Sequence, residues 1–243
     1  DEPLDYAAGQ FADISIDSMP GVSRSYSFAT PSQPDGQLSF FVRKVHGGIF
    51  FFSVNEQDLV GQPMQIEGPS GNFWLRSSDA PMLLLAGGSG LAPVLALLQD
   101  ALAKGVTRSA TLLFGARTEA DLYALEEIES IARRWQGDFR FIPILSESCI
   151  GDGWTGRRGL VGELIPEIIV PGAHAYLCGP PAMIDGAVNS LTRQGIYSQH
   201  IHADRFNTRQ DMANAAAEPG PATVQAHLEN AGIFDYLKYF TFL

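Results

Sequence analysis

Two segments of this 243-residue chain each join an apolar run to a glycine-containing turn and then to the start of a helix pattern. The first, residues 82–93, reads MLLLAGGSGLAP, and the second, residues 176–183, reads YLCGPPAM. Such an apolar run is typical of a buried strand, and glycine lets the backbone approach a ligand closely. Because the amides at a helix N-terminus attract anions, these transitions predict where a nucleotide lies.

The first turn departs from the dehydrogenase fingerprint Gly-x-Gly-x-x-Gly. Gly88 and Gly90 fit its beginning, but Pro93 stands where the third glycine is expected. In addition, no acidic residue ends the next strand pattern, which closes at Arg117. The turn therefore disfavours an ordinary dehydrogenase, and taken alone it is also compatible with a simple tight connection between a strand and a helix.

The second turn strengthens the nucleotide interpretation. Cys178 ends the apolar run, and Gly179, Pro180 and Pro181 follow it. Proline in a first helical turn costs no hydrogen bond, so this sequence is typical of a helix start. A cysteine that ends a buried strand more often packs than reacts. The presence of two such transitions in one chain nevertheless favours a nucleotide site over two unrelated turns.

The N-terminal third carries residue types that suit a pyrophosphate and a flat aromatic ring. Strand alternation puts Arg24 and Tyr26 on one face, where arginine can clamp a pyrophosphate and tyrosine can lie against a flat ring. Ser27 can hydrogen-bond a ring nitrogen. A second strand pattern begins near Arg43 and ends in the turn at residues 47–48, whose amides could receive a phosphate.

Taken in order, these motifs resemble those of the ferredoxin-NADP reductase superfamily. The resemblance is strongest to the FAD- and NAD-binding reductase components of bacterial multicomponent oxygenases, such as the aromatic-ring dioxygenase and methane monooxygenase reductases. It covers residues 9–206. It implies an N-terminal antiparallel β-barrel that binds FAD, followed by an α/β domain with a parallel sheet that binds a nicotinamide nucleotide.

The resemblance implies a set of FAD contacts. Arg24 would clamp the pyrophosphate, Tyr26 would lie against the isoalloxazine ring, and Ser27 would bond near flavin N5 as one of two catalytic candidates. The remaining implied FAD contacts are Arg43, Val45, Gly47, Gly48 and Ile49. Phe51 stands where many relatives carry serine or threonine, so a hydroxyl contact to the pyrophosphate is lost.

The resemblance also implies contacts on the nicotinamide side. Cys178, the second catalytic candidate, would help to place the nicotinamide, Ser89 keeps a hydroxyl where threonine is usual, and Phe206 would shield the flavin ring. The implied nucleotide contacts are Gly87, Gly88, Ser89, Gly90, Pro93, Arg117, Glu147, Cys178, Gly179, Pro180 and Pro181. The Asp204 that precedes Arg205 and Phe206 stands where glutamate is common.

The cofactor choice depends on the charges expected at the adenine ribose. Glu147 would repel a 2′-phosphate and could accept hydrogen bonds from a ribose diol, which favours NADH over NADPH. The positive charges of Arg117 and of the two arginines at residues 157–158 favour NADPH instead. On balance the sequence predicts NADH.

Composition limits the partners. A net charge of −11 argues against nucleic acid, which requires a basic face. With Cys149 and Cys178 as the only cysteines, the chain lacks the Cys-x4-Cys-x2-Cys pattern of a plant-type cluster. We therefore expect the 2Fe-2S cluster on a separate ferredoxin or on sequence outside this chain. We expect an oxygenase component to receive electrons from that cluster. The five histidines show no metal-ligand spacing, and a cytoplasmic location is the simplest interpretation.

The patterns predict three parts: residues 1–78 for the FAD barrel, 79–209 for the nucleotide domain, and 210–243 for a linker and an aromatic-rich tail. Few residues precede residue 9, so we expect the barrel to lack its first strand and to have an open edge. The expected strands of the second domain are 82–86, 110–115, 139–145, 173–178 and 200–203. The expected helices are 91–104, 119–135, 162–169 and 181–194.

The tail and the activity leave alternatives open. Residues 233–243 are too short to cross a bilayer, and they could form a helix that docks on a partner, an anchor at a membrane surface, or the start of a cut transmembrane segment. The leading activity is transfer of hydride from NADH to FAD and of single electrons to an iron-sulfur centre. A free flavin reductase and a noncatalytic nucleotide-binding subunit are the alternatives.

Overall fold

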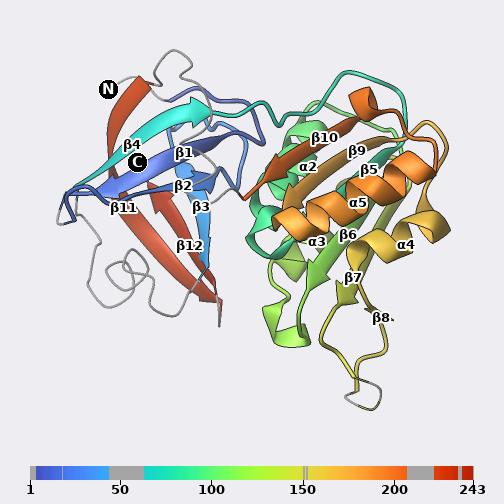
Figure 1. Cartoon of the computed structure of the whole chain (residues 1–243). Coiled ribbons are helices and arrows are strands. Elements are labelled where there is room, and N and C mark those ends of the chain that lie inside the picture. The colour runs from blue at the N-terminus through green and yellow to red at the C-terminus, as the bar shows by residue number, and fades with distance from the viewer. Residues whose placement is uncertain are drawn as a thin grey trace.

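The computed structural model describes residues 4–17, 19–43, 63–149, 151, 153–206, 222–234 and 237–242. For residues 43, 222–234 and 237–242 the structure describes the backbone path alone. The described chain forms two lobes, each built on a six-stranded sheet (Figure 1). The parallel sheet carries helices on both faces, and the other sheet is antiparallel, as the sequence predicts.

The first lobe is an antiparallel sheet with the order β2-β1-β4-β11-β12-β3. Alternation in the sequence produces its buried face, since residues 12, 14 and 16 of the first strand are buried and their neighbours are half-buried. Phe28, Phe40 and Ile66 complete the core of this lobe. Its strands are β1 (Phe11–Ile16), β2 (Ser23–Ser27), β3 (Leu38–Arg43), β4 (Pro63–Ser70), β11 (Ala222–Phe234) and β12 (Leu237–Phe242).

The second lobe is a parallel sheet with the order β10-β9-β5-β6-β7-β8. Its strands are β5 (Met82–Gly87), β6 (Ala110–Ala116), β7 (Phe139–Leu145), β8 (Arg157–Arg158), β9 (His174–Gly179) and β10 (Ile201–Arg205). Its helices are α2 (Leu91–Ala103), α3 (Leu125–Arg134), α4 (Val161–Ile168) and α5 (Pro181–Arg193), with short 3-10 turns η1 (Gly88–Gly90), η2 (Glu119–Asp121) and η3 (Ser198–His200).

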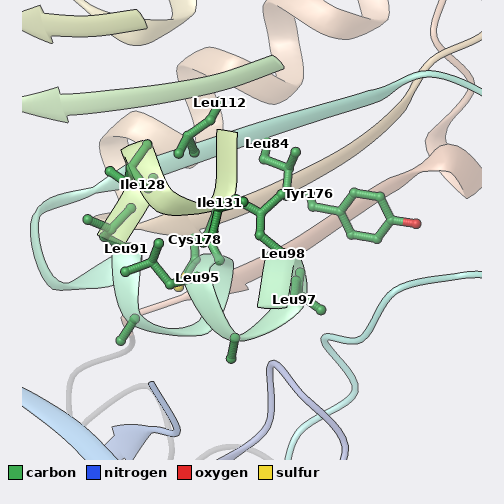
Figure 2. Close-up of a cluster of buried hydrophobic side chains, with 14 of the residues drawn as sticks. Leu84, Leu91, Leu95, Leu97, Leu98, Leu112, Ile128, Ile131, Tyr176 and Cys178 are labelled. Carbon is green, nitrogen blue, oxygen red and sulfur yellow. The ribbon is translucent and has the colours of Figure 1, made fainter. Parts of the chain in front are cut away.

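Helices cover both faces of the second sheet, which explains why its central strands are apolar throughout. Leu84 packs with residues of α2 and α3, as the close-up in Figure 2 shows, whereas Leu83 and Leu85 pack with residues of α4 and α5. All six residues of β5 are buried. The strands and helices expected from the sequence lie within a few residues of the observed ones, with one exception.

The exception is the single helix expected over residues 119–135. The chain instead forms η2, runs through an extended Leu122, and begins α3 only at residue 125. Ala124 interrupts the helix because its φ angle of 54° lies in the left-handed region, which side chains other than glycine rarely adopt. The break places Tyr123 in the core between the helical segments.

The C-terminal tail corrects a second expectation. A docking or anchoring helix over residues 233–243 is wrong, because the described residues of that segment belong to strands of the first sheet, which cover residues 222–234 and 237–242. They pair with β4 and β3, so the open edge expected for that sheet is occupied by the tail. In the described part of the chain, no helix combines the length and apolarity required to cross a membrane.

A histidine cluster at the start of β9 and β10 makes stability dependent on pH. The rings of His174 and His200 stack at 4.3 Å, and burial, assisted by nearby Arg76, lowers the pKa of His202 to about 4. An unfolded histidine takes up its proton near pH 6.5. The folded state therefore binds fewer protons between these values, and we expect stability to be constant above pH 6.5 and to fall as the pH drops toward 4.

The measurement is the urea midpoint at pH 7 and pH 5 for the parent and for His202→Gln. The parent should lose more stability than the variant over this interval. Comparison of the two chains is necessary because Asp204 also titrates in this interval. Burial raises the pKa of Asp204 to about 6, so its protonation stabilises the folded state as the pH falls, and this contribution is the same in both chains. Equal losses in the two chains would show that His202 does not govern the acid response.

Candidate nucleotide and flavin site

A cleft of about 850 Å³ opens at the carboxyl ends of β5, β6 and β7, where ligands bind to sheets of this kind. Gly87, Gly88 and Ser89 form one wall, Arg117 and Asp121 another, and residues of α4 and of the whole length of α5 contribute to the rest of the lining. The two glycine turns meet here because β5 and β9 are adjacent and parallel, with Ala86 paired to Cys178. The sequence motifs are therefore brought together.

The loop after β5 has the properties of a phosphate cradle. No side chain caps the N-terminus of α2, and its first turn carries no acidic residue, so the amides there face no competing anion from that turn. Gly88 adopts a φ angle of 54°. At Gly90 a Cβ atom would lie 2.2 Å from the carbonyl oxygen of Cys178, so only glycine fits. These features fit a dinucleotide pyrophosphate.

Tyr123 connects this cradle to the first lobe. Its hydroxyl donates a hydrogen bond to the carbonyl oxygen of Gly88 at 2.9 Å. Its ring meets Phe41 of β3 edge-on, with centroids 5.2 Å apart, and Phe114 of β6 in the same manner at 5.4 Å. Phe41 belongs to a buried cluster that also contains residues of α2. A strand of the first lobe is therefore packed beside the loop that follows β5.

Cys178 lies at the end of β9, beneath that loop, and its side chain is fully buried. Its Sγ lies 3.9 Å from Oδ2 of Asp204. Burial raises the pKa of the Cys178 thiol, and the neighbouring Asp204 raises it further, so the thiol is protonated at neutral pH. Cys178 is thus suited to packing in the core beside α2, where it does not line the cleft, and not to attack as a thiolate.

The acidic-x-Phe segment that the resemblance identifies, residues 204–206, lies beside Cys178. Asp204 is paired with Cys178 across β10 and β9, and the amide of Phe206 donates a hydrogen bond to the carbonyl of Gly179 at 3.2 Å. Phe206 is half-buried against the cluster that contains α2 and Phe41. It therefore lies at the junction of the two lobes.

The other predicted nucleotide contacts are divided between the cleft and its surroundings. Pro180 lines the cleft, whereas Pro93 is buried in the first turn of α2. Gly179 is buried and Pro181 is exposed at the first position of α5. Glu147 is exposed and does not line the cleft.

Asp121 and Arg193 also line the cleft, and the sequence did not predict either of them. Arg117 forms an ion pair with Asp121 at 3.2 Å. Burial acts to raise the pKa of Asp121, but hydrogen bonds from Arg117 and Thr118 lower it overall, so the cleft holds an ionised carboxylate. The pattern Thr118-x-x-Asp121, a capping signature, is the signal that could have identified it.

The predicted flavin residues lie on β2. Register pairs Tyr26 with Ala12 and Arg24 with Ile14, so both side chains lie on the face that carries the barrel core, as alternation predicts. Burial raises the pKa of Tyr26, although Arg24 acts to lower it, so the phenol stays protonated. Both are half-buried. A guanidinium beside a protonated phenol suits a pyrophosphate and a flat ring, respectively.

Ser27 and the adjoining loop complete the comparison with the sequence. Ser27 is half-buried and occupies the opposite face of β2, at its last position. Arg43 ends β3, and only its backbone is described. Val45, Gly47, Gly48 and Ile49 lie outside the described residues. Among the residues described, no group of three or more histidine, cysteine or acidic side chains is placed to hold a metal ion.

The fold and the cleft define a class: a two-lobed oxidoreductase with a flavin-type β lobe and a nicotinamide-nucleotide lobe. Two family models match the chain, the oxidoreductase FAD-binding domain over residues 1–74 and the oxidoreductase NAD-binding domain over residues 84–189. The chain belongs to these FAD- and NAD-binding oxidoreductases of the ferredoxin reductase type.

Two relatives illustrate the similarity. The chain is 42% identical over 210 residues to the xylene/toluene monooxygenase electron transfer component of Pseudomonas putida, covering 86% of this chain and 60% of that protein. It is 36% identical over 217 residues to the phenol hydroxylase P5 protein of Acinetobacter pittii, covering 88% and 61%. The chain thus spans about three fifths of the length of these relatives.

Solved structures agree on the fold. A cytochrome P450 reductase of Amycolatopsis superposes with a TM-score of 0.77 at 32% identity, covering 85% of this chain and 63% of that one. The ferredoxin reductase in carbazole 1,9a-dioxygenase superposes with a TM-score of 0.76 at 26% identity, covering 85% and 62%. Both matches support the two-lobed fold, and the assignment of FAD to the first lobe and of a nicotinamide nucleotide to the second comes from the family models.

Proposed function

We propose that this chain is the reductase portion of an oxygenase system, which takes hydride from NADH onto FAD and delivers single electrons to a 2Fe-2S centre of a partner. The observation that carries the proposal is the contact of the phosphate loop with the flavin lobe through Tyr123, which donates to Gly88 and packs on Phe41. The similarity to electron-transfer components of monooxygenases supports the partner assignment.

The side chains of this chain would bind and position the two cofactors. We assign the pyrophosphate of the nicotinamide nucleotide to Gly87, Gly88 and Ser89, and the FAD pyrophosphate to Arg24. Tyr26 and Ser27 would hold the flavin ring. Cys178, kept neutral by burial, would support the nicotinamide. When bound, the nicotinamide and the flavin supply the hydride and one-electron chemistry.

The partner assignment is tested by reconstitution. The FAD-loaded chain is mixed with NADH and a purified 2Fe-2S ferredoxin from an oxygenase system, and reduction of the cluster is followed optically under anaerobic conditions. Free FAD serves as the competing acceptor. We expect cluster reduction that exceeds release of reduced flavin. Rapid turnover of free FAD without cluster reduction would instead identify a free flavin reductase.

The preference for NADH over NADPH is a separate proposal, which we now assign to Asp121. This carboxylate lines the cleft and neutralises Arg117, the cation that could otherwise pair with a 2′-phosphate. Asp121→Asn should release Arg117 and remove the repulsion. We expect the ratio of kcat/KM for NADH to that for NADPH to fall about tenfold, which corresponds to about 1.4 kcal/mol.

Glu147→Gln provides the matched control, because it removes the same charge at an exposed position outside the cleft. We expect Glu147→Gln to leave the NADH/NADPH ratio within about twofold of the parent value, since an exposed charge outside the cleft is screened by solvent. If the NADH/NADPH ratio changed strongly in Glu147→Gln and not in Asp121→Asn, Glu147 and not Asp121 would be the residue that discriminates between the two nucleotides.

A further inference from the structure

The six strands of the first lobe form a closed ring. The ladder runs from β2 through β1, β4, β11 and β12 to β3. It returns to its beginning through a bridge between Phe28 and Phe40 and a hydrogen bond of 2.7 Å from the amide of Ala29 to the carbonyl of Ser39. Figure 1 shows the C-terminal strands β11 and β12, drawn in red, beside the blue and cyan N-terminal strands.

The two C-terminal strands fill one gap in this ring. The first half of β11 pairs with β4, with Val224 opposite Ile66, and the second half pairs with β12. The other edge of β12 pairs with β3, with Phe240 opposite Phe40. Without this hairpin, β4 and β3 would each present a row of unpaired backbone groups, which is unfavourable for a sheet edge.

The hairpin also ends near the segment that enters β1. Phe242 pairs with Leu38 on β3, and Phe40, two residues further along β3, bridges to Phe28, which directly follows β2. Tyr6 stacks on Phe28 with ring centroids 3.7 Å apart. Two strand spacings of about 5 Å, a step of about 7 Å along β3 and one tyrosine side chain therefore separate the end of β12 from the segment that enters β1. The seven residue steps from Phe242 through Leu243 and Asp1 to Tyr6 could reach about 23 Å.

We propose that β11 and β12 are integral strands of the flavin lobe. If the path of a chain is followed through the barrel from strand to strand, these two strands come before β1. The first lobe is then a circularly permuted barrel, whose uninterrupted order is β11, β12, β1, β2, β3, β4. The inference rests on backbone pairing and does not depend on the proposed electron transfer. It also means that two connections join the lobes: β4 leads into β5 of the nucleotide lobe, and β10 of the nucleotide lobe leads into β11.

The test restores the uninterrupted order. The chain is cut within residues 207–221, and Leu243 is joined directly to Asp1, so that the hairpin segment precedes β1. The matched control carries the same rearrangement with the sequence of residues 222–242 scrambled. A third chain ends at Phe206 and lacks the hairpin. Amide hydrogen exchange of β3 and β4 is the readout, because it requires no bound cofactor.

We expect the permuted chain to retain the parent's protection at β3 and β4 within about twofold. The scrambled control and the shortened chain should exchange there about a hundredfold faster, while β5 and β9 stay protected in all chains. Parent-like protection in the scrambled control, or loss of protection in the permuted chain, would overturn the proposal. If the shortened chain is insoluble, the comparison of the permuted and scrambled chains still decides.

FAD affinity is measured on the same chains as a second readout. We expect the permuted chain to bind FAD as the parent does. If no chain, including the parent, binds FAD while the exchange pattern holds, the proposed function fails and the strand assignment stands. The two proposals can therefore fail independently.

Discussion

Gly90→Ala is expected to raise the KM for NADH at least about tenfold and to slow flavin reduction. The added Cβ atom would lie 2.2 Å from the carbonyl oxygen of Cys178 and 2.5 Å from its carbonyl carbon. Both are backbone atoms of a buried strand, so η1 must move away from β9 and the phosphate cradle with it. The measurement is steady-state kinetics with a one-electron dye as acceptor, together with FAD content.

Gly186→Ala is the control for this prediction. Gly186 also lines the cleft, but a Cβ atom there meets nothing within 4 Å, and the residue lies inside α5. Alanine in a helix is favoured over glycine by about 1 kcal/mol, so this variant should be as stable as the parent or more so. Unchanged kinetics in Gly90→Ala would contradict the role of the loop as a phosphate cradle.

Cys178→Ala is expected to lower the rate of flavin reduction by NADH by about tenfold or more, with a smaller effect on the KM for NADH. The reason is that the side chain packs in the core beside α2 while the backbone of Cys178 lies against Gly90, so a smaller side chain would shift the loop to which we assign the nicotinamide nucleotide. Stopped-flow reduction at saturating NADH measures this rate directly. The rate should show no titration of a thiol, because burial and Asp204 raise the pKa of Cys178.

Cys149→Ala is the appropriate control, because Cys149 is the exposed cysteine and does not line the cleft. It should leave the reduction rate unchanged. Thermal unfolding of both variants separates a local effect from loss of the fold, since Cys178 also packs in the core beside α2. A Cys178→Ala chain with a parent-like reduction rate would show that this residue serves packing alone.

The nucleotide lobe is predictable because its signals are local. The strands β5 and β9 read as apolar runs, and glycine and proline mark the points where α2 and α5 begin. The break at Ala124 was missed because a left-handed alanine gives no sequence signal of the kind that glycine gives. It is set by the burial of Tyr123, which depends on tertiary contacts.

The tail was missed for a different reason. Residues 233–243 are rich in aromatic residues but show no simple period, and their structure depends on pairing with β3, about two hundred residues earlier in the chain. At the site, the sequence identified the loop at residues 87–89 but not Asp121, because proximity in the cleft depends on the order of β5 and β6 in the sheet. Strand pairing between distant segments and proximity across a sheet cannot be predicted from a local sequence pattern.

The central claim is hydride transfer from NADH to FAD held in one chain, and an anaerobic titration tests it most directly. The chain is loaded with FAD, freed of excess flavin, and titrated with NADH while the yellow absorbance of the bound flavin is recorded. We predict loss of that absorbance, complete at one NADH per bound FAD. A chain that binds FAD and NADH but keeps its absorbance unchanged would contradict the account.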